Sequence, residues 1–132
     1  MPLLYSGQEA GNTKRLEFFE RDPIKWQEHP YKAIYTTLFH LKKTNQALWN
    51  GSNGAEQVRI ATSNDVSIYA FSRSKATNQV VGIFNLSGQA QSFSLNQPVA
   101  AGLSNLFTGK KETLKSGQKI ELKPWEYKVL VK

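Results

Sequence analysis

The sequence has 132 residues, a formal net charge of +7 and no cysteine. Its content of 39% hydrophobic and 11% aromatic residues is enough for a folded core and argues against global disorder. The lack of cysteine excludes disulfides and thiolate metal sites, and no apolar run approaches the roughly 20 residues that span a bilayer. Zero cysteine suits a reducing cytoplasm as well as a periplasmic or secreted bacterial enzyme, so the compartment stays open.

The basic residues are spread along the chain, and only three adjacent pairs occur: Lys14-Arg15, Lys42-Lys43 and Lys110-Lys111. A pI near 9.7 is compatible with a nucleic-acid partner. However, many of the lysines fall in alternating segments typical of strands with one solvated face, and no nucleic-acid-binding motif is present. We therefore expect neither nucleic acid nor a membrane as a partner.

The chain opens with an apolar run, Pro2–Tyr5, which Ser6-Gly7 ends. A short continuous apolar run bounded by turn residues predicts a strand buried on both faces, as in a parallel sheet. Polar residues and glycines follow, and the Asp22-Pro23 step marks a turn because proline disfavours helix in the residue before it. The sequence thus predicts one strand and then a loop.

A helix is predicted from about Pro30 to Thr44. Proline suits the first helical position, where its missing N–H would have no partner anyway. Lys42 and Lys43 suit the last turn, where they complement the helix dipole. Apolar residues recur at helical spacing on one face: Tyr31, Ile34, Tyr35, Leu38 and Leu41.

From about residue 56 onward, every segment has the pattern of a β-strand. Short alternating runs recur with turns between them, which is typical of a sandwich or barrel. Val80–Leu86 is the most apolar run and is predicted to be a central strand. The other predicted strands are Val58–Ala61, Val66–Phe71, Ser92–Leu95, Gly102–Phe107, Lys119–Leu122 and Tyr127–Val131.

One parallel strand before a helix has no partner in such a chain, which suggests that its neighbouring strands are missing. The exposed edges and faces of Pro2–Tyr5 would then need another cover. We expect residues 1–26 to be mobile, to repack on the sandwich, or to self-associate with another copy.

The run Pro2–Gly11 closely resembles the motif at the eighth and last barrel strand of the α-amylase family of glycoside hydrolases. Residues 18–26 and 31–48 resemble the loop and the final barrel helix that follow. Residues 69–73, 81–87, 106–109 and 122–130 resemble, in order, strands of the family's C-terminal antiparallel domain. The resemblance implies a mainly β fold: an antiparallel Greek-key β-sandwich (55–132) preceded by a remnant βα unit of a (β/α)8 barrel (1–50).

The resemblance implies the C-terminal portion of an enzyme that acts on α-glucans such as starch or maltodextrin. Its catalytic Asp, Glu and Asp would follow earlier barrel strands, and no position here matches them. The chain is therefore expected to be a structural, stabilising part that is not catalytic by itself. Its partners would be the catalytic barrel and, through the whole enzyme, the α-glucan. No cofactor and no metal are expected.

Two residues are candidates for substrate binding. Glu9 follows the predicted barrel strand, on the face where such barrels hold their active sites, and the resemblance gives it a supporting role. Arg15 falls in a loop that lines the cleft in relatives, where a basic group can hydrogen-bond a sugar.

An alternative is a stand-alone carbohydrate-binding β-sandwich. Trp26, Trp49 and Trp125 are candidate sugar platforms, but each also fits the seam between barrel and sandwich, and we favour that packing role.

Overall fold

The computed structural model describes residues 2–132. Its contacts fall into two compact units, Met1–Thr44 and Asn45–Lys132. The stretch after the helix belongs to the second unit, because the short helix η2 (Gln46–Leu48) contacts strands β2 (Ile68–Lys75) and β3 (Asn78–Asn85). The division into domains 1–50 and 55–132 stays a prediction.

Residues 2–44 of the first unit form one α-helix, α1 (Pro30–Thr44), at the predicted bounds, and the 3-10 helix η1 (Gln8–Ala10). Lys42 and Lys43 occupy the last turn of α1 as expected. Within this helix the structure buries Leu41. A mixture of cap chemistry and apolar spacing was therefore enough to locate both ends of α1.

The predicted strand at Pro2–Tyr5 is wrong: residues 2–5 form no strand, and Met1 lies outside the described residues. Leu3 is 88% exposed and Tyr5 is 59% exposed. A strand requires a hydrogen-bonded neighbour, and no described strand pairs with this segment. The Tyr5 N–H instead donates to Oε1 of Gln8, at 2.9 Å.

Two glycines shape the segment around η1. Gly7 and Gly11 both have positive φ, at 92° and 70°, and they flank η1 on either side. A Cβ on Gly11 would lie 2.6 Å from Cδ2 of the His29 ring, too close for any side chain. Glycine is therefore required at Gly11 both by its backbone conformation and by its contact with His29.

We expect Gly11→Ala to speed amide exchange at Gly11 and Asn12, whose N–H groups bond Gln8 and Gly7 carbonyls. The left-handed conformation costs roughly 1–2 kcal/mol for alanine, which is about 5- to 30-fold in exchange rate, and the clash adds to this. Gly109→Ala is the matched control, since Gly109 has the same φ of 70° with nothing within 4 Å. It should leave those two amides unchanged, and equal exchange in wild type and G11A would contradict the account.

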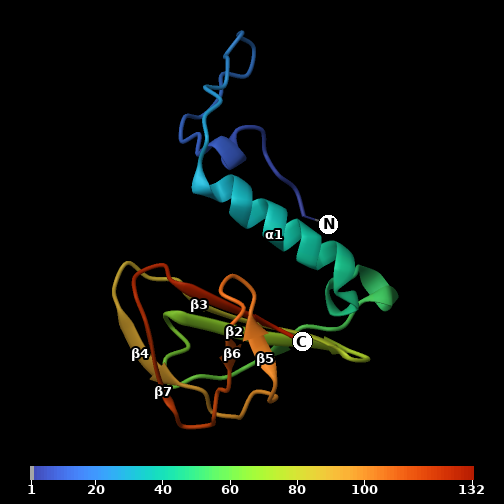
Figure 1. Cartoon of the computed structure of the whole chain (residues 1–132). Helices are drawn as coiled ribbons and strands as arrows, with labels where there is room; N and C mark the ends of the chain where they lie inside the picture. Colours follow the sequence, from blue (N-terminus) through green and yellow to red (C-terminus); the bar gives the residue numbers. More distant parts are fainter. Residues whose placement is uncertain (1) are drawn as a thin grey trace. The chain divides into compact units, whose positions relative to one another are not determined.

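The second unit is built from two antiparallel sheets (Figure 1). The larger has the order β1-β2-β3-β8-β5-β6, and the smaller pairs β4 with β7. Strand β8 pairs with both β3 and β5, the long return typical of a Greek key. The strands not yet given bounds are β1 (Val58–Arg59), β4 (Gln91–Ser94), β5 (Leu103–Asn105), β6 (Lys111–Glu112), β7 (Lys119–Leu122) and β8 (Tyr127–Val131).

One buried cluster of apolar side chains fills the space between the two sheets. Strand β7 alternates exposed and buried residues, as expected for a strand with one face on a core. Strand β3 is central, as predicted, and nearly all of its residues are buried or half-buried on both faces. The mainly antiparallel sandwich predicted from the sequence is thus confirmed. The cluster consists of Ile60, Ile68, Ala70, Val81, Ile83, Phe93, Leu95, Leu103, Leu114, Ile120, Leu122 and Leu130.

The strands predicted at Val58–Ala61 and Val66–Phe71 are both shorter at the turn between them: β1 ends at Arg59, and Val66 lies outside β2 and is 99% exposed. The cause is the carboxylate of Asp65, whose Oδ1 accepts hydrogen bonds from the N–H and the hydroxyl of Thr62, both at 2.8 Å. These bonds lower the pKa of Asp65 and hold a wide turn. As a result β2 begins two residues later than predicted, at Ile68.

A polar cluster ties three strands of the larger sheet together. Glu112 on β6 accepts hydrogen bonds from Lys128 Nζ (2.8 Å) on β8 and from Asn105 Nδ2 (3.0 Å) on β5. Burial raises the pKa of Glu112, but the bonds from Lys128 and Asn105 together outweigh it, so the pKa is lowered overall.

Because the folded-state pKa of Glu112 is lowered, its contribution to stability is present above the unfolded-state value and is lost as pH falls through the folded-state value. We expect Glu112→Gln to lower the free energy of unfolding by about 1 kcal/mol at pH 7. Urea titrations from pH 7 to pH 3 should show this difference shrinking below the usual range for Glu. A difference that is constant with pH would contradict the ion pair.

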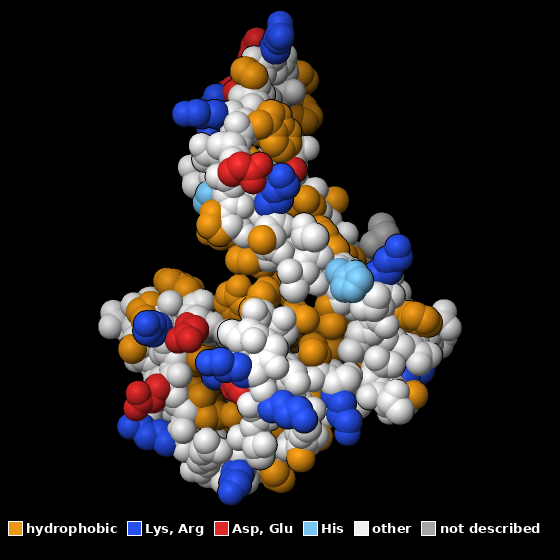
Figure 2. Space-filling model, in the orientation of Figure 1, with side chains coloured by type: hydrophobic (Ala, Val, Ile, Leu, Met, Phe, Trp, Pro, Cys, Tyr) orange, Lys and Arg blue, Asp and Glu red, His pale blue; other side chains and the backbone are white. Residues whose placement is uncertain are grey.

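No described helix has the length and apolarity needed to cross a membrane. On the face drawn in Figure 2, Lys and Arg side chains lie scattered among Asp and Glu rather than in a continuous stripe. The expectation that the chain binds no nucleic acid stays a prediction.

Candidate functional site

Glu9 lies in η1, where its side chain folds back onto its own turn. Its Oε2 accepts a hydrogen bond from the N–H of Gly7, at 3.1 Å. The residue is half-buried and lines a cavity of about 520 Å³. The other lining residues of this cavity are Ala10, Trp26, Gln27, Glu28 and Lys32. Glu9 thus orders the backbone of the segment that resembles the last barrel strand.

Arg15 lies in the loop after η1 and lines a different cavity, of about 540 Å³, with Tyr5, Leu16, Glu17 and Phe18. It is exposed, and it makes no hydrogen bond or ion pair with any residue from 2 to 132. The structure therefore does not bring Arg15 and Glu9 into one site. The guanidinium keeps all its donors available to a ligand.

The loop that carries Arg15 is held by one carboxylate. Asp22 accepts hydrogen bonds from Lys14 Nζ at 2.8 Å and from the Glu17 N–H at 3.0 Å. The Lys14 bond, followed by the Glu17 bond, lowers the pKa of Asp22. Asp22 therefore stays ionised and closes the loop on both sides of Arg15.

The shifted carboxyl groups do not resemble a catalytic acid. A glycosidase acid needs a raised pKa so that it is protonated at working pH. The shifts found are all downward, and they belong to Asp22, Asp65, Glu112 and Glu121. Among the described residues, no group of three or more His, Asp or Glu side chains is placed to hold a metal ion.

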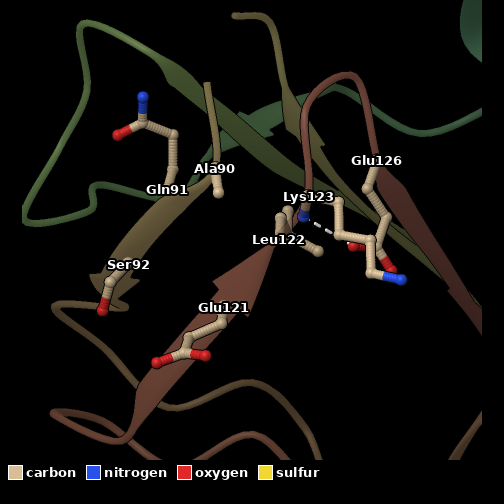
Figure 3. A pocket seen from close by; sticks show the side chains of 7 residues that line it. All are labelled: Ala90, Gln91, Ser92, Glu121, Leu122, Lys123 and Glu126. Atoms are coloured by element: carbon tan, nitrogen blue, oxygen red, sulfur yellow. Dashed lines mark hydrogen bonds between the residues drawn. The ribbon is translucent and has the colours of Figure 1, made fainter. Parts of the chain in front are cut away.

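Besides the two cavities of the first unit, a cavity of about 530 Å³ lies in the sandwich, between strands β4 and β7 and the turn before β8 (Figure 3). The lining residues are Ala90, Gln91, Ser92, Glu121, Leu122, Lys123 and Glu126. Sequence analysis did not identify this place, because it is formed by two segments about 30 residues apart that only the fold brings together.

A buried asparagine fixes both walls of this cavity. Asn85 is 1% exposed, and its Nδ2 donates to the carbonyls of Gln89 (2.7 Å) and Lys123 (2.8 Å). Its Oδ1 accepts from the N–H and the hydroxyl of Ser87, at 3.0 and 2.7 Å. One side chain therefore joins the 87–89 loop to the 123–126 turn.

No family model matches the chain, and no curated protein matches it. Several solved structures do match the chain. A noncanonic maltogenic α-amylase, AmyB from Thermotoga neapolitana, superposes with a TM-score of 0.79 at 17% identity, over 99% of this chain and 32% of that one.

Two further solved structures give lower scores. AmyP in complex with maltose has a TM-score of 0.61 at 17% identity, over 85% of this chain and 23% of that one. Trehalose-6-phosphate hydrolase from Bacillus licheniformis has a TM-score of 0.57 at 19% identity, over 76% and 18%. This chain thus spans a third or less of the solved chains that it resembles. The resemblance to α-amylase-family enzymes is therefore confirmed at the level of the fold.

Proposed function

We propose that the chain is the C-terminal portion of a glycoside hydrolase that acts on α-glucans. In this proposal the sandwich, residues 45–132, stabilises a catalytic barrel whose Asp, Glu and Asp lie in sequence outside this chain. The first unit, including α1, completes that barrel. The chain alone then performs no hydrolysis.

The observation that carries the proposal is the superposition of 99% of the chain, both units included, on part of a maltogenic α-amylase. The run Pro2–Gly11 supports it independently, because it resembles the motif of the last barrel strand. The first unit adds a physical argument. Half of its large apolar side chains are exposed among residues 2–44, as expected of a surface that needs a covering partner. The most exposed are Leu3 (88%), Phe18 (89%), Phe19 (90%) and Trp26 (63%).

Two partners could cover these side chains: the proposed barrel or a second copy of this chain. We favour the barrel, because the run Pro2–Gly11 resembles a barrel strand. Self-association of the isolated chain is the expected consequence when the barrel is absent.

Arg15 is proposed to contact a donor-side sugar, and Glu9 to order the backbone beside it. In the complete enzyme we expect Arg15→Ala to raise KM for maltoheptaose by about 3- to 10-fold with kcat unchanged, as for one lost hydrogen bond in ground and transition states alike. Lys25→Ala, an exposed basic residue nearby in sequence, is the control. An unchanged KM in R15A would contradict the assignment.

The coding DNA upstream of this chain tests the proposal. We expect one continuous reading frame that encodes seven further barrel strands with an Asp, a Glu and an Asp after strands four, five and seven. A frame without these carboxylates would refute the proposal and favour the carbohydrate-binding module.

A further inference from the structure

The turn before β8 holds a large aromatic residue in an unfavourable conformation. Lys123, Pro124, Trp125 and Glu126 form a tight turn in which the Glu126 N–H donates to the Lys123 carbonyl, at 3.1 Å. Trp125 has a φ of 60°, a region that glycine occupies at least cost. For a bulky residue this conformation is unfavourable, because its Cβ comes too close to the following carbonyl oxygen. Such strain is typical of functional sites, so Trp125 needs an explanation beyond folding.

The indole of Trp125 lies against the 87–89 loop, but most of the residue is exposed. A Cβ on Gly88 would lie 3.8 Å from Cζ2 and 3.9 Å from Nε1 of Trp125, so the 87–89 loop supports part of the ring. The backbone N–H of Trp125 also donates to the Ser87 carbonyl, at 3.2 Å. Even so, the residue is 65% exposed. The sandwich therefore presents a flat aromatic surface that is not used to fill its core.

Trp125 belongs to the turn whose residues Lys123 and Glu126 line the 530 Å³ cavity shown in Figure 3, although Trp125 itself is not among the lining residues. In the sequence Trp125 lies between Lys123 and Glu126, and its indole lies next to Gly88, two residues before the lining residue Ala90. The cavity volume falls within the roughly 300–1,000 Å³ of small-molecule sites.

The cavity offers hydrogen-bonding groups that the described residues leave unused. Glu126 accepts one bond through Oε2, from the Lys123 N–H at 2.7 Å, and no described residue donates to its Oε1. The Lys123 ammonium and the Ser92 hydroxyl have no hydrogen-bond partner among residues 2–132. Figure 3 shows Lys123 and Glu126 on one side of the cavity and Ser92 on the other.

These features match the chemistry of a sugar ring, which has an apolar C–H face and a rim of hydroxyls that donate and accept. An open indole suits the apolar face, while a carboxylate, an ammonium and a hydroxyl suit the rim. We propose that this place is a surface binding site for a glucose oligosaccharide, with Trp125 as the stacking platform and Glu126, Lys123 and Ser92 as hydrogen-bonding partners. The choice of α-linked glucose rests on the proposed function.

Asn85 preorganises the site, because its side chain bonds both the 87–89 loop, which contacts Trp125, and the 123–126 turn, which contains Trp125. A rigid aromatic and a fixed turn lose little entropy when a ligand binds. The site would hold an α-glucan chain on the sandwich, independently of any catalytic cleft.

The test is an NMR titration of the whole 132-residue chain with maltoheptaose, following the indole N–H signals of its three tryptophans and the backbone amides. We expect saturable shifts in the millimolar range for the Trp125 indole and for amides in 87–92 and 121–126, without shifts of the Trp26 and Trp49 indoles. Trp125→Gly, which relieves the positive φ and removes the platform, should abolish the amide shifts. Lys123→Ala should weaken binding by about 3- to 10-fold, as for one hydrogen bond.

Lys115→Ala, the same charge change on another exposed turn, should bind as wild type does. Absence of shifts, shifts that persist in W125G, or equal shifts with cellohexaose would overturn the site or its α-glucan preference. None of these outcomes touches the proposed function, which the upstream reading frame tests separately.

Discussion

Asn85→Ala is expected to lower the free energy of unfolding of the sandwich by about 3 kcal/mol. The substitution removes four hydrogen bonds from a side chain that is 1% exposed. It also leaves the Ser87 N–H without its acceptor in a part-buried place, and such a loss costs about 1–3 kcal/mol. Urea unfolding followed by tryptophan fluorescence and circular dichroism measures the change.

The matched control for this variant is Asn96→Ala. Asn96 is exposed, and its only hydrogen bonds within residues 2–132 are made by its backbone. It should change stability by less than about 0.5 kcal/mol. Equal effects of the two substitutions would show that Asn85 does not join the two walls of the sandwich cavity.

Leu130→Ala is expected to cost about 2–5 kcal/mol, the usual range for a leucine removed from a packed core. Leu130 is fully buried, at 0% exposure, in the strand between β3 and β5. Its neighbours across the ladder are Val81 on β3 and Asn105 on β5. Because β8 is paired on both sides, its backbone is held in place and cannot shift far to refill the space.

Val131→Ala is the control, because successive residues of a strand point to opposite faces. Val131 is half-buried and should cost about 1 kcal/mol. A loss in L130A no larger than that in V131A would contradict the two-layer core. The chain has to be studied at low concentration, so that self-association does not mask the result.

The elements that were predicted well are those with strong local signals. Pro30 at the first position and two lysines in the last turn defined α1, and alternation of apolar residues defined β8 at its observed bounds. Local pattern failed where structure depends on a neighbour or on one side chain. The run Pro2–Tyr5 has the composition of a buried strand but no partner to pair with, and the bonds to Asp65 delay the start of β2.

The candidate site was predicted less well. The sequence identified Glu9 and Arg15 from the motif and its loop, but not that they line separate cavities. It identified Trp125 as a candidate platform and favoured packing against the barrel; the structure leaves this residue 65% exposed, and packing against a barrel stays a prediction. Its neighbour Gly88 and the lining residues Gln91 and Ser92 come from another hairpin, so no local spacing pointed to them. The one local signal was proline followed by a bulky residue, at the place in a turn where glycine is common.

The two proposals assign different tasks to the two units. The first unit would complete a catalytic barrel, and the second would stabilise that barrel while holding a chain of the substrate at Trp125. This division predicts that loss of the Trp125 site weakens binding to long α-glucans and leaves hydrolysis of short ones unchanged.

The most direct test of the central claim is a hydrolysis assay with maltoheptaose. It compares the 132-residue chain with the protein encoded by the complete reading frame. The account predicts rapid release of shorter sugars by the complete protein and none by the chain alone, because the acid and the nucleophile lie outside it. Hydrolysis by the chain alone, or none by the complete protein, would contradict the account.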